Sequence, residues 1–546
     1  MKMVKSLLLG SAAGLIAVAG AQAADLPVKA KAVEYVKICS LYGVGYYYIP
    51  GTDTCIKIGG YVRLEAYHNA AGGLYAEGTP QGSFTRQGAT YAMQARFRMS
   101  ADVRTQTEYG TLRSYFAFGL NALNNPGGAF ETSGPTLAVA MERAFIQFAG
   151  FTLGRSDTFF AFYNGAAYGL VPFGFDGSSG PSGLNVAAYT WQFGNGLSAT
   201  FSVEDQIAHS AGVVDLGNGL GQAAVPNPAF PGVGQPQFLS AAIPNGSGVM
   251  GSTLFNSNLG GDQGGGKMPD LVGNLRVDQA WGSAQIMGAL HQVTARYNVQ
   301  SDSVGGSPSN ARTCSLVANV GSNTAECGAP DDKWGWAVGA GMTLKMPWDA
   351  KDTLSGQIAY AEGASKYVAF TYGNRSLHRD DGISIGAFND AVFASGPAAN
   401  GVGNTLELTK TWGGTLAFEH YWTPSLRTSW VAGYLEVEYS DAAKAMLVNV
   451  GASQCAANNV RLATNAQCAD ADWSMWRLAS RTMWNPVQNL DVGLEVAYTN
   501  VNTAFAGTMN ANTTGLGTTG LSSGKYNIDD NSYWTATFRV QRNFWP

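Results

Sequence analysis

The stretches Ile56–Tyr67 (IKIGGYVRLEAY) and Tyr91–Arg104 (YAMQARFRMSADVR) alternate between two kinds of side chain. In the second stretch Phe97 and Met99 fall on one face, and Arg98 falls on the other. This period of two is that of a β-strand with one apolar and one polar face. A soluble sandwich shows the same period, so one such strand does not decide between a membrane and a soluble protein.

The decisive feature is how the alternating segments are joined. Short turns such as Gly194-Asn195 and Trp422–Pro424 alternate with long loops along the chain, which is typical of outer-membrane barrels. Closure of sixteen strands leaves an aqueous channel and satisfies the backbone groups that lipid cannot. The pattern therefore predicts an all-β fold, a 16-stranded antiparallel transmembrane β-barrel with long external loops. The expected strands are 56–67, 90–104, 109–120, 136–149, 150–156, 184–193, 196–205, 269–279, 281–293, 333–345, 352–364, 409–421, 425–438, 473–484, 488–500 and 530–544.

The first residues predict export. Lys2 and Lys5 precede a short apolar run, and Ala21-Gln22-Ala23 is a small-residue cleavage pattern, so residues 1–23 are interpreted as a signal peptide. Residues 24–55 are then an N-terminal periplasmic segment, and residues 56–546 form the barrel. No run after the signal peptide has the length of a transmembrane helix.

Composition excludes some partners and suits a membrane barrel. Charged residues make up 13% of the chain and the formal net charge is −5, which argues against a nucleic-acid partner. Tryptophans fall beside short turns or at the start of strands that follow long loops, where two interfacial girdles would need them. They are Trp281, Trp348, Trp422, Trp484, Trp334, Trp412, Trp473 and Trp534.

The six cysteines form three close pairs along the sequence. Six cysteines allow fifteen connectivities, and sequence alone does not choose among them. In an exported protein, local disulfides within turn-rich segments are the simplest hypothesis. The expected bonds are Cys39–Cys55, Cys314–Cys327 and Cys455–Cys468.

Several stretches resemble the alphaproteobacterial porin family, which includes the Brucella Omp2 porins and the rhizobial general porins. They are VEYVKIC at 33–39, YYYIPGTDTC at 46–55, GGYVR at 59–63, ERAFIQF at 142–148, FTLGRS at 151–156 and VQRNF at 540–544. The resemblance implies a passive diffusion pore for small hydrophilic solutes and ions in the Gram-negative outer membrane. It also implies a homotrimer and one long loop folded into the lumen.

A passive pore selects by diameter and by the charges at its narrowest point. By analogy with the family, the loop 157–183 is the constriction candidate, and it carries Asp157 and Asp176. A set of arginines is expected on the opposite wall, on strand positions that face inward, where a charge that never titrates would keep a permanent field. They are Arg63, Arg96, Arg98, Arg113 and Arg143.

Other chemistry is not supported by the residues. Gly261–Met268 approaches a phosphate-loop spacing but has Met268 at the Ser/Thr position. The five histidines have no metal-ligand spacing, so no metal, cofactor or catalytic residue is predicted. A substrate-selective channel is the alternative within transport, and a barrel enzyme or an adhesin is the alternative outside it. The expected partners are outer-membrane lipid and lipopolysaccharide. Paired acids of the long loops are interpreted as solvated charges, with a cation site that bridges to lipopolysaccharide as the alternative.

Overall fold

The sixteen expected strands are all present, and they close into one antiparallel barrel. The computed structural model describes residues 37–69, 82–83, 91–124, 136–171, 175, 177, 183–215, 263–295, 329–369, 375–379, 382–393, 405–451, 460–462, 471–504, 506–511 and 524–544. Within these ranges the barrel strands are β2 (Thr54–His68), β4 (Tyr91–Thr107), β5 (Gly110–Asn124), β6 (Thr136–Phe148), β7 (Phe151–Ser156), β8 (Leu184–Gly194), β9 (Leu197–Glu204), β11 (Asp270–Gln279), β12 (Gly282–Val293), β13 (Lys333–Lys345), β14 (Thr353–Glu362), β19 (Lys410–Thr423), β20 (Leu426–Glu438), β22 (Trp473–Trp484), β23 (Leu490–Asn502) and β26 (Asn531–Asn543).

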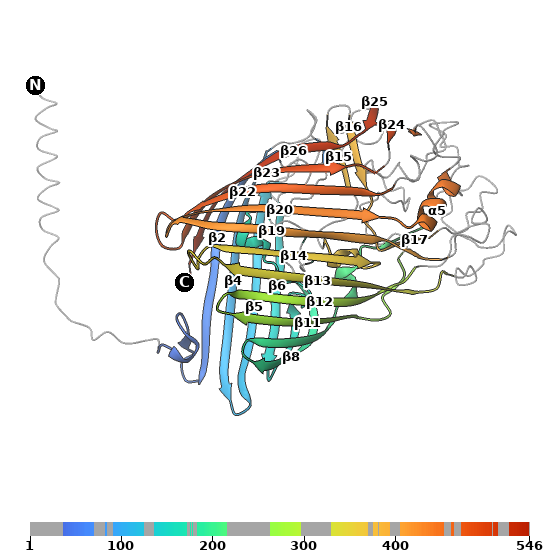
Figure 1. Ribbon diagram of the computed structural model, residues 1–546. Helices are drawn as coiled ribbons and strands as arrows, with labels where there is room; N and C mark the ends of the chain where they lie inside the picture. The colour runs from blue at the N-terminus through green and yellow to red at the C-terminus, as the bar shows by residue number, and fades with distance from the viewer. Residues whose placement is uncertain are drawn as a thin grey trace, which may run out of the picture.

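The barrel closes between its first and last strands. β2 pairs with β26 from Tyr61↔Asn543 to His68↔Ala536, while its other edge pairs with β4. Each remaining barrel strand pairs with the barrel strand that follows it along the chain (Figure 1). The closed ladder leaves no edge strand for lipid to meet, as a membrane-spanning sheet requires.

Tight turns join the strands at one end, called here the short-turn end. The turn between β8 and β9 contains Asn195 and Gly196, both with positive φ (49° and 74°). Asn-Gly suits such a hairpin turn because both residues tolerate this backbone region. A Cβ at Gly196 would lie 1.9 Å from the carbonyl oxygen of Asp278, so only glycine fits there.

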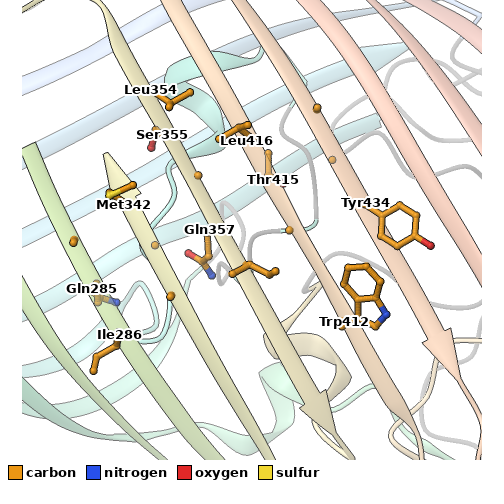
Figure 2. Close-up of a pocket in the computed structure, with 18 of the residues that line it drawn as sticks. Gln285, Ile286, Met342, Leu354, Ser355, Gln357, Trp412, Thr415, Leu416 and Tyr434 are labelled. Atoms are coloured by element: carbon orange, nitrogen blue, oxygen red, sulfur yellow. The ribbon is translucent and has the colours of Figure 1, made fainter. Parts of the chain in front are cut away.

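The two faces of the wall differ as the alternation predicts. Ile286 and Leu416 are exposed on the outer face. They lie in an apolar groove of about 970 Å³ that crosses the barrel strands β11, β12, β13, β14, β19 and β20 (Figure 2). Their neighbours Gln285 and Thr415 point inward, where both bond to carbonyl groups of the loop 157–183. The wall therefore presents hydrocarbon to lipid and polar groups to the lumen.

The expected tryptophan girdles are present, with one exception. Tryptophans next to the short turns, such as Trp281 and Trp422, are exposed on the outside, and Trp334 and Trp534 are exposed at the other end. Trp473 was expected in the second girdle, but it is 3% exposed. Its indole N–H donates to the carbonyl of Ala387 at 2.6 Å, because a loop packs over the start of β22.

The described parts of the other long loops lie at the opposite end, called the long-loop end, and several of them pair with one another (Figure 1). In one sheet of six strands, β15–β3 and β16–β25 pair in parallel although they belong to different loops. Its strands are β3 (Gly82–Ser83), β15 (Arg375–Arg379), β16 (Gly382–Gly386), β21 (Val460–Leu462), β24 (Gly507–Ala511) and β25 (Gly524–Ile528), and a three-stranded sheet joins β10 (Val213–Asp215), β17 (Ala391–Phe393) and β18 (Glu407–Leu408).

The helices are short and lie outside the wall's ladder. They are η1 (Ser40–Tyr42), α2 (Gly165–Tyr168), α3 (Gln206–His209), η4 (Ser365–Tyr367) and α5 (Asp441–Gly451). In the part of the chain that the structure describes, no helix is long and apolar enough to cross a membrane.

Phe97 tests which face of the wall meets lipid. Its ring stacks on Phe544 at 6.1 Å and meets Phe118 edge-on at 6.4 Å on the outer face. We expect Phe97→Arg to cost roughly 2–4 kcal/mol of barrel stability, by the cost of a charge facing the bilayer. Arg98→Ala, on the inner face, should leave folding nearly unchanged. Urea unfolding followed by heat-modifiable gel shift measures both, and equal damage would contradict the register.

One of the three expected disulfides lies within the described residues. Cys39 and Cys55 are bonded, as the sequence predicted. The pairs Cys314–Cys327 and Cys455–Cys468 lie outside the described residues and stay predictions. Peptide mapping without reduction should find each of these pairs linked internally, and a cross-linked peptide joining two pairs would contradict them.

Candidate functional site

The five expected arginines all lie on the inner face of neighbouring strands. Arg63 of β2 is directly paired with Arg96 of β4, and Arg98 follows on the same face. Arg113 of β5 and Arg143 of β6 continue the row around the wall. These five residues are called the arginine face below.

A β-bulge in β6 turns two consecutive charged side chains toward the lumen. The register shifts so that Ala117 pairs with Arg143 and Phe118 pairs with Met141. Glu142 is the extra residue between them. An extra residue leaves the ladder unpaired locally and re-aims the side chains around it, so Glu142 and Arg143 both point inward.

Glu142 is the central acid of the arginine face. Its carboxylate accepts a hydrogen bond from Nε of Arg98 at 2.6 Å and another from Nη2 of Arg96. A Cβ at Gly119 would lie 2.8 Å from Arg96 Nη2 and 2.9 Å from Glu142 Oε1. The glycine therefore leaves room for this ion pair.

The other arginines are also held by nearby acids. Asp102 accepts from Nε of Arg104 at 2.9 Å and from Nη2 of Arg113 at 2.8 Å. Arg63 Nη1 lies 3.6 Å from Glu65 Oε1. Charge-assisted bonds of this kind fix the guanidinium groups in place, and each carboxylate offsets part of their positive field.

Asp157, the expected acid of the lumenal loop, is an ion-pair partner of Arg143. The loop begins immediately after β7, which brings the carboxylate beside the arginine face at that point. Asp176 lies outside the described residues.

The described part of the loop 157–183 is folded into the lumen, as expected. Near its start, the N–H of Phe159 donates to Glu204 at 2.9 Å and its carbonyl accepts from Asn274 at 2.7 Å. The N–H of Phe162 donates to Gln357 at 2.8 Å. Irregular backbone at membrane depth needs such partners in place of water, and the inward side chains of the wall supply them.

The tip of the loop, residues 165–171, is held from the opposite side of the barrel. Glu495 of β23 accepts from the N–H of Leu170 at 2.5 Å. Arg539 of β26 donates to the carbonyl of Leu170 at 2.5 Å, and Arg481 of β22 donates to the carbonyl of Ala167 at 2.6 Å. The tip is therefore bound by charged groups through its backbone.

Each of these charged groups has a counter-ion in the wall. Pairing offsets the cost of burying them, because an unpaired buried charge is strongly destabilising. The pairs are Arg481–Glu419, Arg539–Glu65 and Arg477–Glu495. Residues 165–171 and these six side chains are called the loop clamp.

Aromatic rings fill the space between the loop and the wall. Phe160, Tyr163 and Phe175 are buried. The ring of Phe160 lies 5.0 Å from that of Tyr367 in η4, and Tyr163 stacks on Tyr168 at 5.6 Å. This packing gives the lumenal loop a hydrophobic core of its own.

A buried polar network joins the loop to the long-loop end. Asp270 bonds to His291 at 2.8 Å and to the hydroxyl of Tyr367 at 2.7 Å. Asp390 accepts from the N–H of Ser365 at 2.8 Å. Burial raises the pKa of the Asp390 carboxyl and raises the pKa of the Tyr367 hydroxyl well above its usual value. Within the described ranges no group of three His, Cys, Asp or Glu side chains is placed to hold a metal ion.

Glu142 and the members of the loop clamp were missed at the sequence level. Glu142 and Arg143 are consecutive charged residues in an otherwise alternating segment, and this break in period was a usable sign of the bulge. Glu495 and Arg539 gave no local sign, because their partners lie 325 and 369 residues away.

Comparison with known proteins identifies the family to which this barrel belongs. The family model described as the porin subfamily matches residues 25–530. The "Porin Omp2b" proteins of Brucella abortus (strain 2308) and Brucella suis biovar 1 (strain 1330) are each 33% identical over 287 residues, which is 51% of this chain and 64% of the relative. The chain thus matches less than two thirds of the length of these relatives.

Among solved structures, the outer membrane channel DcaP of Acinetobacter baumannii shares the fold, with a TM-score of 0.50 and 13% identity. The match covers 91% of this chain and 99% of that one. Because the family match spans nearly the whole chain and the fold is a closed sixteen-stranded barrel, this multi-pass outer-membrane protein belongs to the porin family.

Proposed function

We propose that this protein is a passive, water-filled channel for small hydrophilic solutes and ions, and that it is not an enzyme. The observation that carries the proposal is a closed barrel whose inner face is polar and whose lumen is narrowed by one loop bound to the wall. A sixteen-stranded barrel is wide enough for an aqueous path.

The constriction in this proposal lies between the loop 157–183 and the arginine face. Arg63, Arg96, Arg98, Arg113 and Arg143 line it together with Asp157, and Asp176 belongs to the same loop. The carboxylates of Glu142, Asp102, Asp157 and Glu65 offset part of the positive charge of these arginines. Weak ion selectivity is the consequence, because opposite charges at close range cancel for a permeating ion.

The barrel's surroundings form part of the same proposal. The outer face meets lipid and, at the long-loop end, lipopolysaccharide, and the functional unit is a homotrimer. Residues 24–55 lie on the periplasmic side. Support comes from the exposed apolar side chains of the outer wall and from the orientation rule that short turns face the periplasm.

Recording from the purified protein in planar bilayers tests the proposal. Discrete ohmic conductance steps in simple salts, together with swelling of liposomes in small sugars, are expected. Saturable block by one solute would favour a substrate-selective channel instead. An absence of conductance from a folded, heat-modifiable protein would refute the pore.

A further inference from the structure

The described residues before the barrel form a small disulfide-bonded unit, called here the N-terminal lobe (residues 37–53). Ile38 bridges to Tyr47, and the short strand β1 (Tyr47–Tyr48) pairs with the start of β2 at Cys55 and Ile56. The disulfide Cys39–Cys55 joins the lobe to the barrel. In Figure 1 the lobe is the dark blue segment beside the start of β2, away from the long loops.

The lobe covers the inner face of the wall. The hydroxyl of Tyr42 donates to Gln106 at 3.4 Å, and the guanidinium of Arg104 lies 5.1 Å from the ring of Tyr46. Lys57 donates to the carbonyl of Val44 at 3.3 Å.

The alternation of side chains along β2 and β4 shows which face of the wall the lobe contacts. Lys57 of β2 shares the face of Arg63, and Arg104 of β4 shares the face of Arg98, because the pairing of β2 with β4 continues without a bulge from Thr54 to His68. A side chain two residues along a strand returns to the same face. The contacts of the lobe are therefore on the lumenal side of the wall.

A few buried groups hold the lobe against the wall. Cys39, Cys55 and Tyr46 are its buried core, whereas Leu41 and Val44 are exposed. The hydroxyl of Tyr46 bonds to Asp102, and burial raises the pKa of Tyr46 to about 12. A core this small rarely holds a fold by itself, and a disulfide is the common way to supplement it.

Where the lobe contacts the wall, called here its seat, several cationic side chains lie over tyrosine rings. Lys37 lies 5.0 Å from the ring centre of Tyr48, and Lys57 lies 5.8 Å from that of Tyr46. Arg104 and Arg113 are next to them and share one carboxylate, Asp102. Asp53 is in the exposed turn that follows β1.

We propose that the N-terminal lobe is a disulfide-stapled cap that narrows the periplasmic mouth of the pore and adds a second filter there, one that favours small anions. This inference rests on the proposed channel function. It assigns to the lobe a part in permeation that adds to the constriction formed by the loop 157–183 and shares Arg113 with it. Solutes cross two narrow places in series, and the disulfide keeps the second one in position.

The test removes the staple from the full-length mature protein. The double variant Cys39→Ala/Cys55→Ala should show larger single-channel conductance than the wild-type protein, and it should admit larger sugars in liposome swelling. Using this variant in place of a reductant leaves the other four cysteines unchanged. Unchanged conductance and sugar cut-off in the folded variant would overturn the cap. Failure of the variant to form a heat-modifiable barrel would also overturn it, because the lobe would then be part of the folding core.

Two single substitutions with a matched control test the seat. Tyr46→Phe removes only the hydroxyl that bonds to Asp102, and it should raise conductance or current noise. Tyr47→Phe is the control, since Tyr47 pairs with Ile56 on the outer parity of β2, and it should behave as the wild-type protein. Equal effects of both variants would contradict the lumenal seat.

The charge of the filter is tested by Lys57→Gln. Reversal potentials under a salt gradient should shift toward cations, and the shift should be larger when the dilute side is periplasmic, where screening is weaker. An unshifted potential would remove the anion preference from the proposal. If the wild-type protein does not conduct, the channel function itself fails; if it conducts and no lobe variant differs from it, only the cap fails.

Discussion

Glu142→Gln is expected to make the pore distinctly more anion-selective. The carboxylate of Glu142 bonds to both Arg96 and Arg98, so its neutralisation leaves two guanidinium charges without their shared counter-ion. A unit charge about 4 Å from a permeating ion changes its energy by about 1 kcal/mol in water. We therefore expect the anion-to-cation permeability ratio to rise several-fold, measured as the reversal potential under a salt gradient.

Two further variants serve as a control and as a test of the opposite sign for this prediction. Asp278→Asn removes the same charge from an exposed pair with Arg276 near the short-turn end, where salt screens it, and it should shift the potential much less. Neutralising Arg96, Arg98 and Arg113 together should shift it the other way, toward cations. If Asp278→Asn had the larger effect, the arginine face would not be the selective element.

Glu495→Ala is expected to release the tip of the lumenal loop and raise conductance. Glu495 is 2% exposed and accepts a hydrogen bond from the N–H of Leu170, and its loss also removes the carboxylate from the ion pair with buried Arg477. Removing one member of a buried ion pair costs about 3–5 kcal/mol. Because the sixteen-stranded ladder does not include the loop, this cost should fall on loop docking before it falls on barrel closure.

Single-channel recording measures this effect as larger and noisier current steps. Glu436→Ala is the matched control, since Glu436 bonds to Tyr434 on the outer face of β20 and lies away from the lumen. Steps of wild-type size and noise from Glu495→Ala would show that the loop clamp does not set the width of the pore.

The strands could be predicted from the sequence because a wall between lipid and water imposes a period of two on each segment. The alternation of short and long connections then fixed their number and order. The pairing of loop strands could not be foreseen. β3 and β15 are short, belong to different loops and pair in parallel, so no hairpin turn joins them and no periodicity marks their pairing.

The site was predictable only in part, for a similar reason. Inward arginines follow from parity on strands such as β4, and Arg96 and Arg98 needed no further information. Their counter-ion Glu142 depends on a bulge, which shifts parity by one residue. The bonds from Glu495 and Arg539 to Leu170 join residues that only barrel closure brings together.

The loop clamp also determines the order in which the pore can reach its final width during assembly. The groups that hold Leu170 come from β23 and β26, the last two barrel strands to emerge during synthesis. Leu170 therefore has no docking partner until these two strands have joined the sheet, whereas Ala167 can already bond to Arg481 of β22. The bonds that complete the docking of the loop therefore form only when the barrel closes.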